Sequence, residues 1–145
     1  MRIMLDTNVL LRAFLTPRGA AAELLKMIAA DHLLVTSGYQ LTELLDVLRR
    51  PKIRALHGRD DRAIRHIVSR IYKMALVVPL PTQIPNAVPD DPKDNPIVLT
   101  ATAGQADLLC TLDRHLYNPA VIDFCSGQGL RVLKDADLLA ELRTG

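Results

Sequence analysis

The opening residues constrain the fold more than any other stretch of this chain. Residues 2–5 have the length and character of a short buried strand, and helix-type apolar spacing resumes at residue 9. Asp6 lies at the junction and is followed at once by a hydroxyl and an amide side chain. Open α/β sheets bind their ligands at the carboxyl ends of their strands. Asp6 is expected at such an end, where a carboxylate is unfavourable for the core and needs a partner.

The alternation of short apolar runs with helical patterns continues along the chain. Further strands are expected at residues 32–36, 75–78, 108–112 and 130–133, and helices at residues 9–15, 19–30, 39–49, 96–104 and 135–143, with a turn or short helix at 120–126. Another helix, strongly amphipathic, is expected after Asp60 or Asp61, either of which can cap it. Residues 51–58 show no pattern and are expected to form a link, and residues 79–96, with six prolines, an irregular loop.

Strands that alternate with helices predict a three-layer α/β/α sandwich around a mainly parallel sheet of five strands. A doubly wound order, 3-2-1-4-5, would set the first and fourth strands side by side. The 145 residues are expected to form one domain, 1–145, because 49% of them are hydrophobic and no linker interrupts the pattern. No apolar stretch reaches the roughly 20 residues of a membrane span, and a cytoplasmic protein is expected. Cys110 and Cys125 are expected to be buried free thiols.

Four acidic residues mark the candidate site: Asp6, Glu43, Asp94 and Asp113. Asp6 and Asp113 follow the first and fourth strands, Glu43 lies off the leucine stripe of its helix, and Asp94 precedes the helix at 96–104. Singly, each has a structural interpretation: helix cap for Asp6 and Asp113, solvated helix residue for Glu43, turn residue for Asp94. Together, all four can converge on the carboxyl edge of one sheet.

Converging carboxylates favour a bound metal ion. Two carboxylates about 4 Å apart repel by about 4 kcal/mol at an effective dielectric constant of about 20, so the cluster stays ionised only beside a cation. A ligand set of oxygens alone selects Mg²⁺ or Mn²⁺ over zinc. Such an ion polarises a phosphoryl oxygen and lowers the pKa of a bound water that attacks in line. No Ser-His-Asp set, Cys-His set, G-x-S-x-G motif or P-loop is apparent, and the four histidines are scattered.

The basic residues are concentrated in one segment. Residues 49–73 hold nine Lys or Arg against two Asp, a net charge of +7, whereas the whole chain carries +2 and the remainder therefore −5. A basic segment beside an acid site suits a polyanion such as RNA. The candidate RNA contacts are Arg49, Arg50, Lys52, Arg62 and Arg65. An ordinary solvated helix face has the same spacing.

Four stretches of the chain resemble the PIN-domain family, in particular the VapC-type toxins of bacterial toxin–antitoxin pairs. They are Met-Leu-Asp-Thr-Asn-Val-Leu at 4–10, Thr-Glu-Leu at 42–44, Asp-Pro-Lys-Asp-Asn at 91–95 and Ala-Asp-Leu-Leu-Cys-Thr-Leu-Asp at 106–113. They span nearly the whole chain in the family's order. The resemblance implies an α/β/α sandwich, Mg²⁺- or Mn²⁺-dependent ribonuclease activity, a small antitoxin partner and frequent homodimers.

The resemblance also implies roles for single residues. By position, the four metal-binding acids are Asp6, Glu43, Asp94 and Asp113. Asn8 matches the family's polar residue that orients the first acid or a metal-bound water, with Thr7 beside it. Thr111 matches a supporting hydroxyl at the end of the fourth strand.

Two other functions remain open at the level of the sequence. One is a non-catalytic RNA-binding or regulatory module, which would use the basic segment without cleavage. The other is a Mg²⁺-dependent phosphohydrolase or a phospho-acceptor receiver domain, since Lys134 follows the fifth strand as a receiver would require. The asparagine at position 8, where a phosphatase would usually have a second acid, disfavours the phosphohydrolase.

Overall fold

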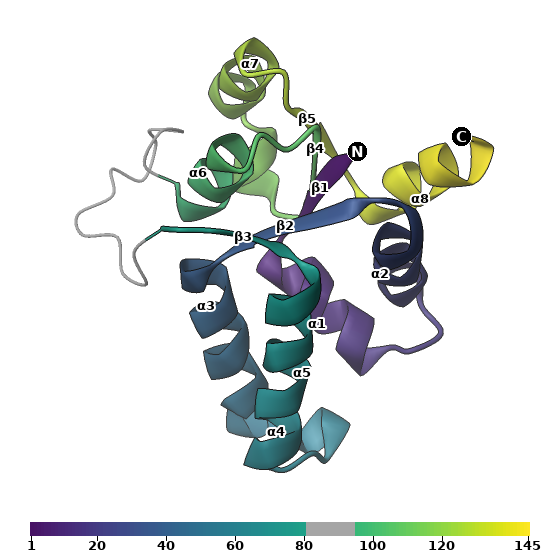
Figure 1. Ribbon diagram of the computed structural model, residues 1–145, viewed down its shortest axis with the longest axis vertical. Helices are drawn as coiled ribbons and strands as arrows, with labels where there is room; N and C mark the ends of the chain where they lie inside the picture. The colour runs from purple at the N-terminus through teal and green to yellow at the C-terminus, as the bar shows by residue number, and fades with distance from the viewer. Residues whose placement is uncertain (81–94) are drawn as a thin grey trace.

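Five short strands form one sheet at the centre of the molecule (Figure 1). In the computed structural model, which describes residues 1–80 and 95–145, the strands are β1 (Arg2–Leu5), β2 (Leu33–Ser37), β3 (Leu76–Val78), β4 (Leu108–Cys110) and β5 (Arg131–Leu133). They are hydrogen-bonded in the order β3-β2-β1-β4-β5, and all four pairings are parallel. The predicted class and strand order are confirmed, and β1 lies beside β4 with Leu5 opposite Cys110.

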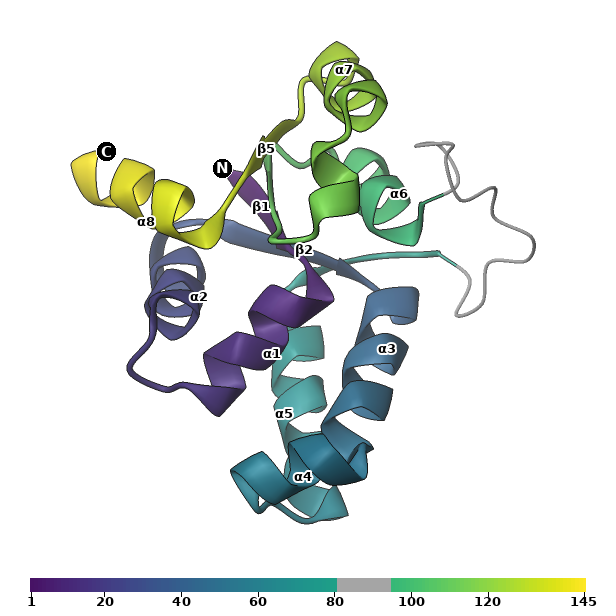
Figure 2. The same cartoon turned by 180° about the vertical axis from the view of Figure 1, so that it is seen from behind.

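Helices cover both faces of the sheet (Figure 2). In the described residues they are α1 (Thr7–Leu15), α2 (Ala20–Asp31), α3 (Gly38–Arg49), α4 (Pro51–His57), α5 (Asp61–Met74), α6 (Pro96–Ala103), α7 (Pro119–Gly127) and α8 (Asp135–Thr144), with a 3-10 turn, η2 (Arg114–Tyr117). Ile3 and Leu5 of β1 pack into the core that includes residues of α1, α2, α3, α5 and α8. Met4, between them, packs into a second core with residues of α6 and α7. The alternation along β1 thus produces the predicted three layers.

Three helix starts that were predicted from capping residues are confirmed. The side chain of Ser37 accepts from the Gln40 N–H of α3 at 3.2 Å, and that of Asp60 accepts from an N–H of α5 at 2.8 Å. Asn95 accepts from the Ile97 N–H of α6 at 2.9 Å. Each cap satisfies a backbone donor that has no partner within its helix. None of the helices in the described part of the chain is long and apolar enough to cross a membrane.

The prediction of an unpatterned link at residues 51–58 is wrong, because α4 occupies most of it. Pro51 begins this helix at a position where a missing N–H costs nothing, and Gly58 ends it in the left-handed conformation at φ +64°. None of its residues is buried. A helix without a buried face leaves no apolar periodicity in the sequence, which explains why the pattern did not predict it.

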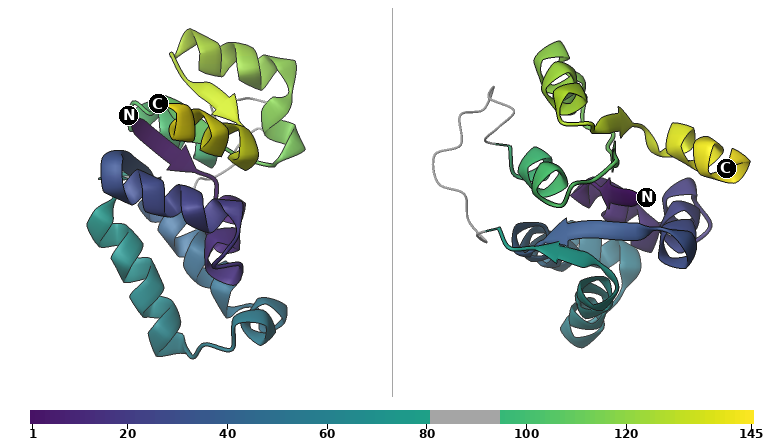
Figure 3. Two further views of the ribbon diagram at one scale, coloured as in Figure 1. Left: turned by 90° about the vertical axis from the view of Figure 1, so that its right-hand side faces the viewer. Right: turned by 45° about the horizontal axis from the view of Figure 1, so that its top comes forward.

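The long helices α3 and α5 pack side by side and project away from the sheet, with α4 at their far end (Figures 1 and 3). His57, the last residue of α4, connects α4 to α3 and to the residues that precede α5. Its Nδ1 accepts from the Arg59 N–H at 2.9 Å, so Nε2 carries the proton and donates to the Leu48 carbonyl at 2.9 Å. The basic segment therefore belongs to a distinct lobe made of α3, α4 and α5.

Candidate functional site

Asp6 is the most enclosed of the predicted acids in the described residues. It follows β1, where its backbone N–H donates to the Cys110 carbonyl at 2.9 Å, and it caps α1. One carboxylate oxygen, Oδ1, accepts from the Thr7 N–H at 2.7 Å, and Oδ2 accepts from the Thr111 hydroxyl at 2.7 Å. The residue is 6% exposed. The structural interpretation as a helix cap is confirmed, and the carboxylate is held at both oxygens at the carboxyl edge of the sheet.

Glu43 and Asp113 lie close enough to Asp6 to act on its charge. Burial is the largest influence and raises the pKa of the Asp6 carboxyl above its ordinary value of 3.8. The hydrogen bonds from Thr111 and Thr7 lower this pKa, and the negative charges of Asp113 and Glu43 raise it again. Glu43, in the second turn of α3, and Asp113, beyond β4, are both half-buried. Two of the other predicted acids therefore lie near enough to Asp6 for their charges to raise its pKa.

Asp113 does not end its strand as predicted, because β4 stops at Cys110. The chain turns instead into η2, which Asp113 caps by accepting from the His115 N–H at 3.0 Å. The turn begins at Thr111, whose hydroxyl accepts from the Asp113 N–H at 3.0 Å. The carboxylate of Asp113 is thus brought toward Asp6 by the turn and not by the strand.

Thr111 connects the two acids. Its hydroxyl donates to Asp6 and accepts from the amide of Asp113, and its own N–H donates to the Leu133 carbonyl at 3.0 Å. Its carbonyl accepts from the Tyr117 hydroxyl at 2.7 Å. The residue is fully buried and uses all its polar groups, so its hydroxyl has one possible orientation.

Thr7 and Asn8, the other two predicted supporting residues, differ in their surroundings. Thr7 is 2% exposed, and its hydroxyl has no hydrogen-bond partner within residues 1–80 and 95–145. Asn8 is exposed on the first turn of α1. A buried hydroxyl without a partner is costly, and beside Asp6 it is a free polar atom that a ligand of the site could satisfy.

The donor chemistry of this region fits a hard divalent cation. Asp6, Glu43 and Asp113 all offer oxygen ligands. A cation beside them would stabilise the charged form of Asp6 and so offset the effects of burial and of like-charge repulsion, both of which raise its pKa. Within residues 1–80 and 95–145, no three His, Cys, Asp or Glu side chains by themselves form a group that could hold a metal ion. The fourth predicted ligand, Asp94, and most of the loop expected at 79–96 lie outside the described residues.

Several buried polar residues next to the acids were not predicted as part of the site: Thr36, Gln40 and Thr100, with Ser37 predicted only as a cap. All four are 0% exposed. The sequence held one signal, because Gln40 precedes Leu44 and Val47 at helical spacing and is therefore an amide on the apolar face of α3. Another unpredicted buried acid, Asp135, lies 3.5 Å from Arg12 and starts α8.

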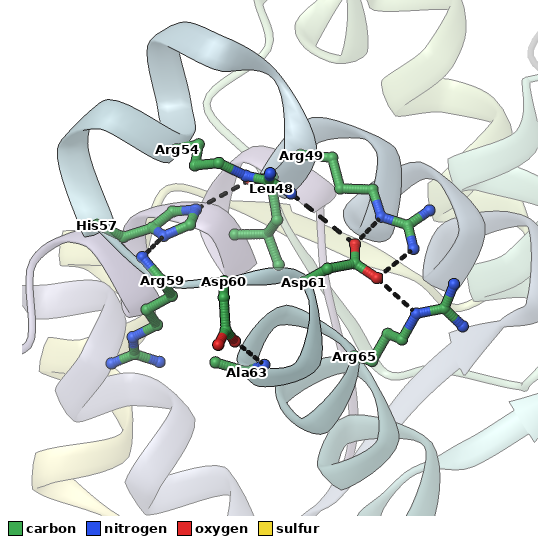
Figure 4. A network of polar contacts seen from close by, with 9 residues as sticks. All are labelled: Leu48, Arg49, Arg54, His57, Arg59, Asp60, Asp61, Ala63 and Arg65. Carbon is green, nitrogen blue, oxygen red and sulfur yellow. Dashed lines mark hydrogen bonds and ion pairs between the residues drawn. The ribbon is translucent and has the colours of Figure 1, made fainter.

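The predicted RNA contacts divide into cations paired with Asp61, which Figure 4 shows, and cations without an ion-pair partner among the described residues. Arg49 donates to both oxygens of Asp61, at 2.6 and 3.2 Å, and Arg65 donates to one of them at 2.8 Å. Arg54 lies 3.8 Å from the same carboxylate. We call these four residues the Asp61 cluster. Among the residues described, no ion-pair partner is found for the other three predicted contacts: Arg50, Lys52 and Arg62.

The surroundings of the two cysteines and of Lys134 indicate structural roles for these side chains. Cys110 and Cys125 are buried free thiols, as predicted, and burial raises the pKa of Cys110 to about 12, which makes it unreactive. The ammonium of Lys134 lies 5.9 Å from the centre of the Tyr117 ring, at cation–π distance. The lysine that kept the receiver alternative open therefore contacts an aromatic ring.

The fold and the acid-bearing edge define a class of protein: a parallel α/β domain with a carboxylate site where β1 and β4 end. A family model described as a PIN domain, PIN_3, matches residues 2–115. The chain belongs to the PIN-domain family, and the predicted resemblance is confirmed.

A solved structure agrees with this assignment. The chain is similar to a chain in the crystal structure of VapBC2 from Rickettsia felis bound to a DNA fragment from their promoter. The TM-score is 0.57 at 15% sequence identity, and the match covers 92% of this chain and 98% of the other. At that identity the likeness shows a shared fold. No curated protein matches the chain.

Proposed function

We propose that this chain is a Mg²⁺- or Mn²⁺-dependent endoribonuclease that acts as the toxin of a toxin–antitoxin pair. The observation that supports the proposal is the buried carboxylate of Asp6 at the end of β1 in a PIN-domain fold, with the charges of Glu43 and Asp113 near enough to raise its pKa. Those residues come from three separate segments of the chain, and their mutual repulsion disfavours the arrangement unless a cation joins it. A cellular RNA substrate also implies that the protein works in the cytoplasm.

The proposed reaction is hydrolysis of a phosphodiester bond, in which a water oxygen bonds to phosphorus and one P–O ester bond breaks. Asp6, Glu43, Asp94 and Asp113 would hold the cation. When bound, it would supply charge stabilisation for the phosphoryl oxygens and lower the pKa of a nearby water. Thr111 and the Thr7 N–H keep the Asp6 carboxylate in one orientation, so that little reorganisation is needed when substrate arrives.

The lobe of α3, α4 and α5 supplies the proposed RNA-binding surface. Three of its cations are exposed: Arg50, Lys52 and Arg62. The guanidinium groups of Arg49 and Arg65 are held by their contacts with Asp61. Arg49 lies six residues beyond Glu43 on α3, or about 9 Å along the helix. RNA bound at the acids could therefore contact the lobe within a few nucleotides.

For the antitoxin, we propose the apolar groove between α1, α2 and α5. Its apolar lining includes Phe14, Leu25, Ala29, Ile67 and Met74. The charged residues among the described ones that line it are all cations: Lys26, Arg59 and Arg70. This combination fits an apolar segment with flanking acidic residues. The similar VapBC2 structure contains an antitoxin by its name, and we extend that partnership to this chain, with a homodimer of the toxin as the assembly.

Cleavage of a labelled single-stranded RNA tests the proposed activity. Wild type should cleave with Mg²⁺ or Mn²⁺ and not with EDTA. Asp6→Asn and Asp113→Asn should each lower the rate by more than about 100-fold, since changes one step removed from a metal already cost about 10–100-fold. Asn also caps helices well, so Asp113→Asn should fold.

The matched control is Asp123→Asn, which removes the same charge from an exposed position on α7 and should cleave like wild type. Cleavage that persists in EDTA, or in both site variants, would contradict the proposal. RNA binding that tightens at low salt, without cleavage in any divalent ion, would support the non-catalytic alternative instead.

A further inference from the structure

A chain of fully buried hydrogen bonds lies between the segments that carry the acids. Ser37, the cap of α3, shares a hydrogen bond of 2.8 Å with Thr100 of α6, and the Thr100 hydroxyl donates to the Pro96 carbonyl at 2.8 Å. Thr36 at the end of β2 donates to Gln40 Oε1 at 2.6 Å. These side chains are 0% exposed except for Pro96, whose carbonyl closes the chain.

Gln40 links α3 to the end of β1. Its Nε2 donates to the Leu5 carbonyl at 2.6 Å. The register between β1 and β2 extends only to Met4 opposite Val35, so the Leu5 carbonyl is the next acceptor beyond the paired residues. The Gln40 amide donates a hydrogen bond to this carbonyl, which lies beyond the last residue of β1 that pairs with β2. Because Thr36 donates to the amide oxygen and Leu5 accepts from the amide nitrogen, the amide has one orientation.

The two ends of this link adjoin two of the acids. Leu5 is bonded directly to Asp6, and Gln40 lies one helical turn before Glu43 on the same helix. The apolar contacts of α3, made by Leu41, Leu44 and Leu48, are non-directional and do not by themselves set its position along β1. A hydrogen bond inside a dry core is directional and costly to leave unmade, so it fixes that position.

We propose that Gln40 is a positioning residue that sets the distance between Glu43 and Asp6. This inference rests on the proposed metal-dependent function, and it adds a residue that does not itself contact the metal or the RNA. Gln40→Met keeps the size of the side chain but cannot donate to Leu5 or accept from Thr36. In that variant α3 is free to shift against β1, and the carboxylates no longer meet at the distance a small cation requires.

The test measures Mn²⁺ affinity by calorimetry, RNA cleavage, and amide hydrogen exchange of residues 40–44 in the metal-free protein. Gln40→Met should bind Mn²⁺ about 10–100-fold more weakly and lower kcat by a similar factor, with KM for RNA nearly unchanged. Exchange of the α3 amides should become faster even without metal. Ile28→Val, a core change in α2, is the destabilised control and should leave all three readouts unchanged.

A double variant separates positioning from general stability. Thr36→Val combined with Gln40→Met removes the orphaned hydroxyl that the single variant leaves, and so should recover part of the lost thermal stability without recovering Mn²⁺ affinity. If Gln40→Met keeps wild-type Mn²⁺ affinity, kcat and α3 exchange, the inference is overturned. If wild type itself neither binds Mn²⁺ nor cleaves RNA, the proposed function fails, and the exchange measurement still decides whether Gln40 holds α3.

Discussion

At the scale of single residues, Asp6 shows a conflict between stability and the proposed chemistry. Its carboxylate has two good hydrogen-bond donors, yet burial and the charges of Glu43 and Asp113 leave its pKa raised. A group whose pKa is higher in the folded than in the unfolded protein stabilises the fold below its unfolded pKa and loses that contribution as pH rises through the folded value. The metal-free protein is therefore expected to be destabilised by Asp6 at neutral pH.

This leads to a prediction about Asp6→Asn in the presence of EDTA. As pH rises above 3.8, the melting temperature of wild type should fall relative to that of the variant, because only wild type must ionise the buried group. Addition of Mn²⁺ should raise the melting temperature of wild type at neutral pH and have little effect on the variant. Thermal melts across pH check both statements. Parallel pH profiles for the two proteins would show that the Asp6 charge is already compensated without metal.

Single residues also mark the limit of prediction from the sequence. Asp6, Glu43 and Asp113 were predicted as site residues because acids at strand ends and off a leucine stripe conflict with a simple core pattern. Gln40 was missed because a single amide on an apolar helix face does not by itself indicate a function. Its partner, the Leu5 carbonyl, is a backbone atom, and the sequence pattern does not show which backbone atoms need a partner. Which backbone carbonyl lacks a strand partner depends on sheet register, and register appears only in the folded chain.

At the scale of secondary-structure elements, the boundaries were predictable where a core face and a cap coincide. The starts of α3, α5 and α6 follow from Ser37, Asp60 and Asn95. The exposed helix α4 has no core face and was missed, and β4 proved shorter than its apolar run because Thr111 turns toward Asp6. A tertiary hydrogen bond, which local sequence does not specify, decided the end of β4, whereas α4 was missed because it buries no face.

The carboxylate of Asp61 connects two helices of the lobe formed by α3, α4 and α5. Hydrogen bonds from Arg49 and Arg65 lower the pKa of Asp61 to about 2, and the Arg49 contact joins α3 to α5. A lowered pKa contributes stability above the unfolded value of 3.8, and the contribution is lost as pH falls toward the folded value. Since the pairs are solvent-exposed, salt should weaken them.

Asp61→Asn is therefore expected to lower the melting temperature modestly at neutral pH. The difference from wild type should shrink as pH falls from about 4 to about 2, and it should also shrink at high salt. Melts at several pH values and salt concentrations measure the effect, with Asp123→Asn as the variant that loses an exposed charge without such partners. A difference that stays constant across this pH range would assign the loss to packing and not to the ion pairs.

At the scale of the whole molecule, the acids and the apolar groove lie on different parts of one sheet sandwich, and α5 belongs both to the groove and to the basic lobe. The acids lie where β1 and β4 end, whereas the groove lies between α1, α2 and α5. Separate surfaces allow variants that affect antitoxin binding and leave the acids unchanged. Ala29 and Lys26 of α2 suit this purpose because both line the groove and are exposed, so their replacement disturbs neither the core nor the basic lobe.

We predict that Ala29→Asp combined with Lys26→Glu weakens binding of the antitoxin by at least about tenfold, or about 1.4 kcal/mol, because both changes oppose an acidic, apolar segment. The partner to test is any small protein that a gene adjacent to this one encodes, titrated against the purified chain. RNA cleavage should remain at the wild-type rate. Arg18→Glu, exposed and outside the groove, is the control. Unchanged affinity in the double variant would place the partner elsewhere.

The buried amide of Gln40 has a consequence for how this protein and its relatives diverge. Replacing Gln40 alone strands the hydroxyl of Thr36, and replacing Thr36 alone leaves an amide oxygen without a donor. Mutational paths through either single change are therefore disfavoured. In descendant lineages the two positions should be exchanged jointly, and this correlated substitution should be visible in an alignment even where overall identity is low.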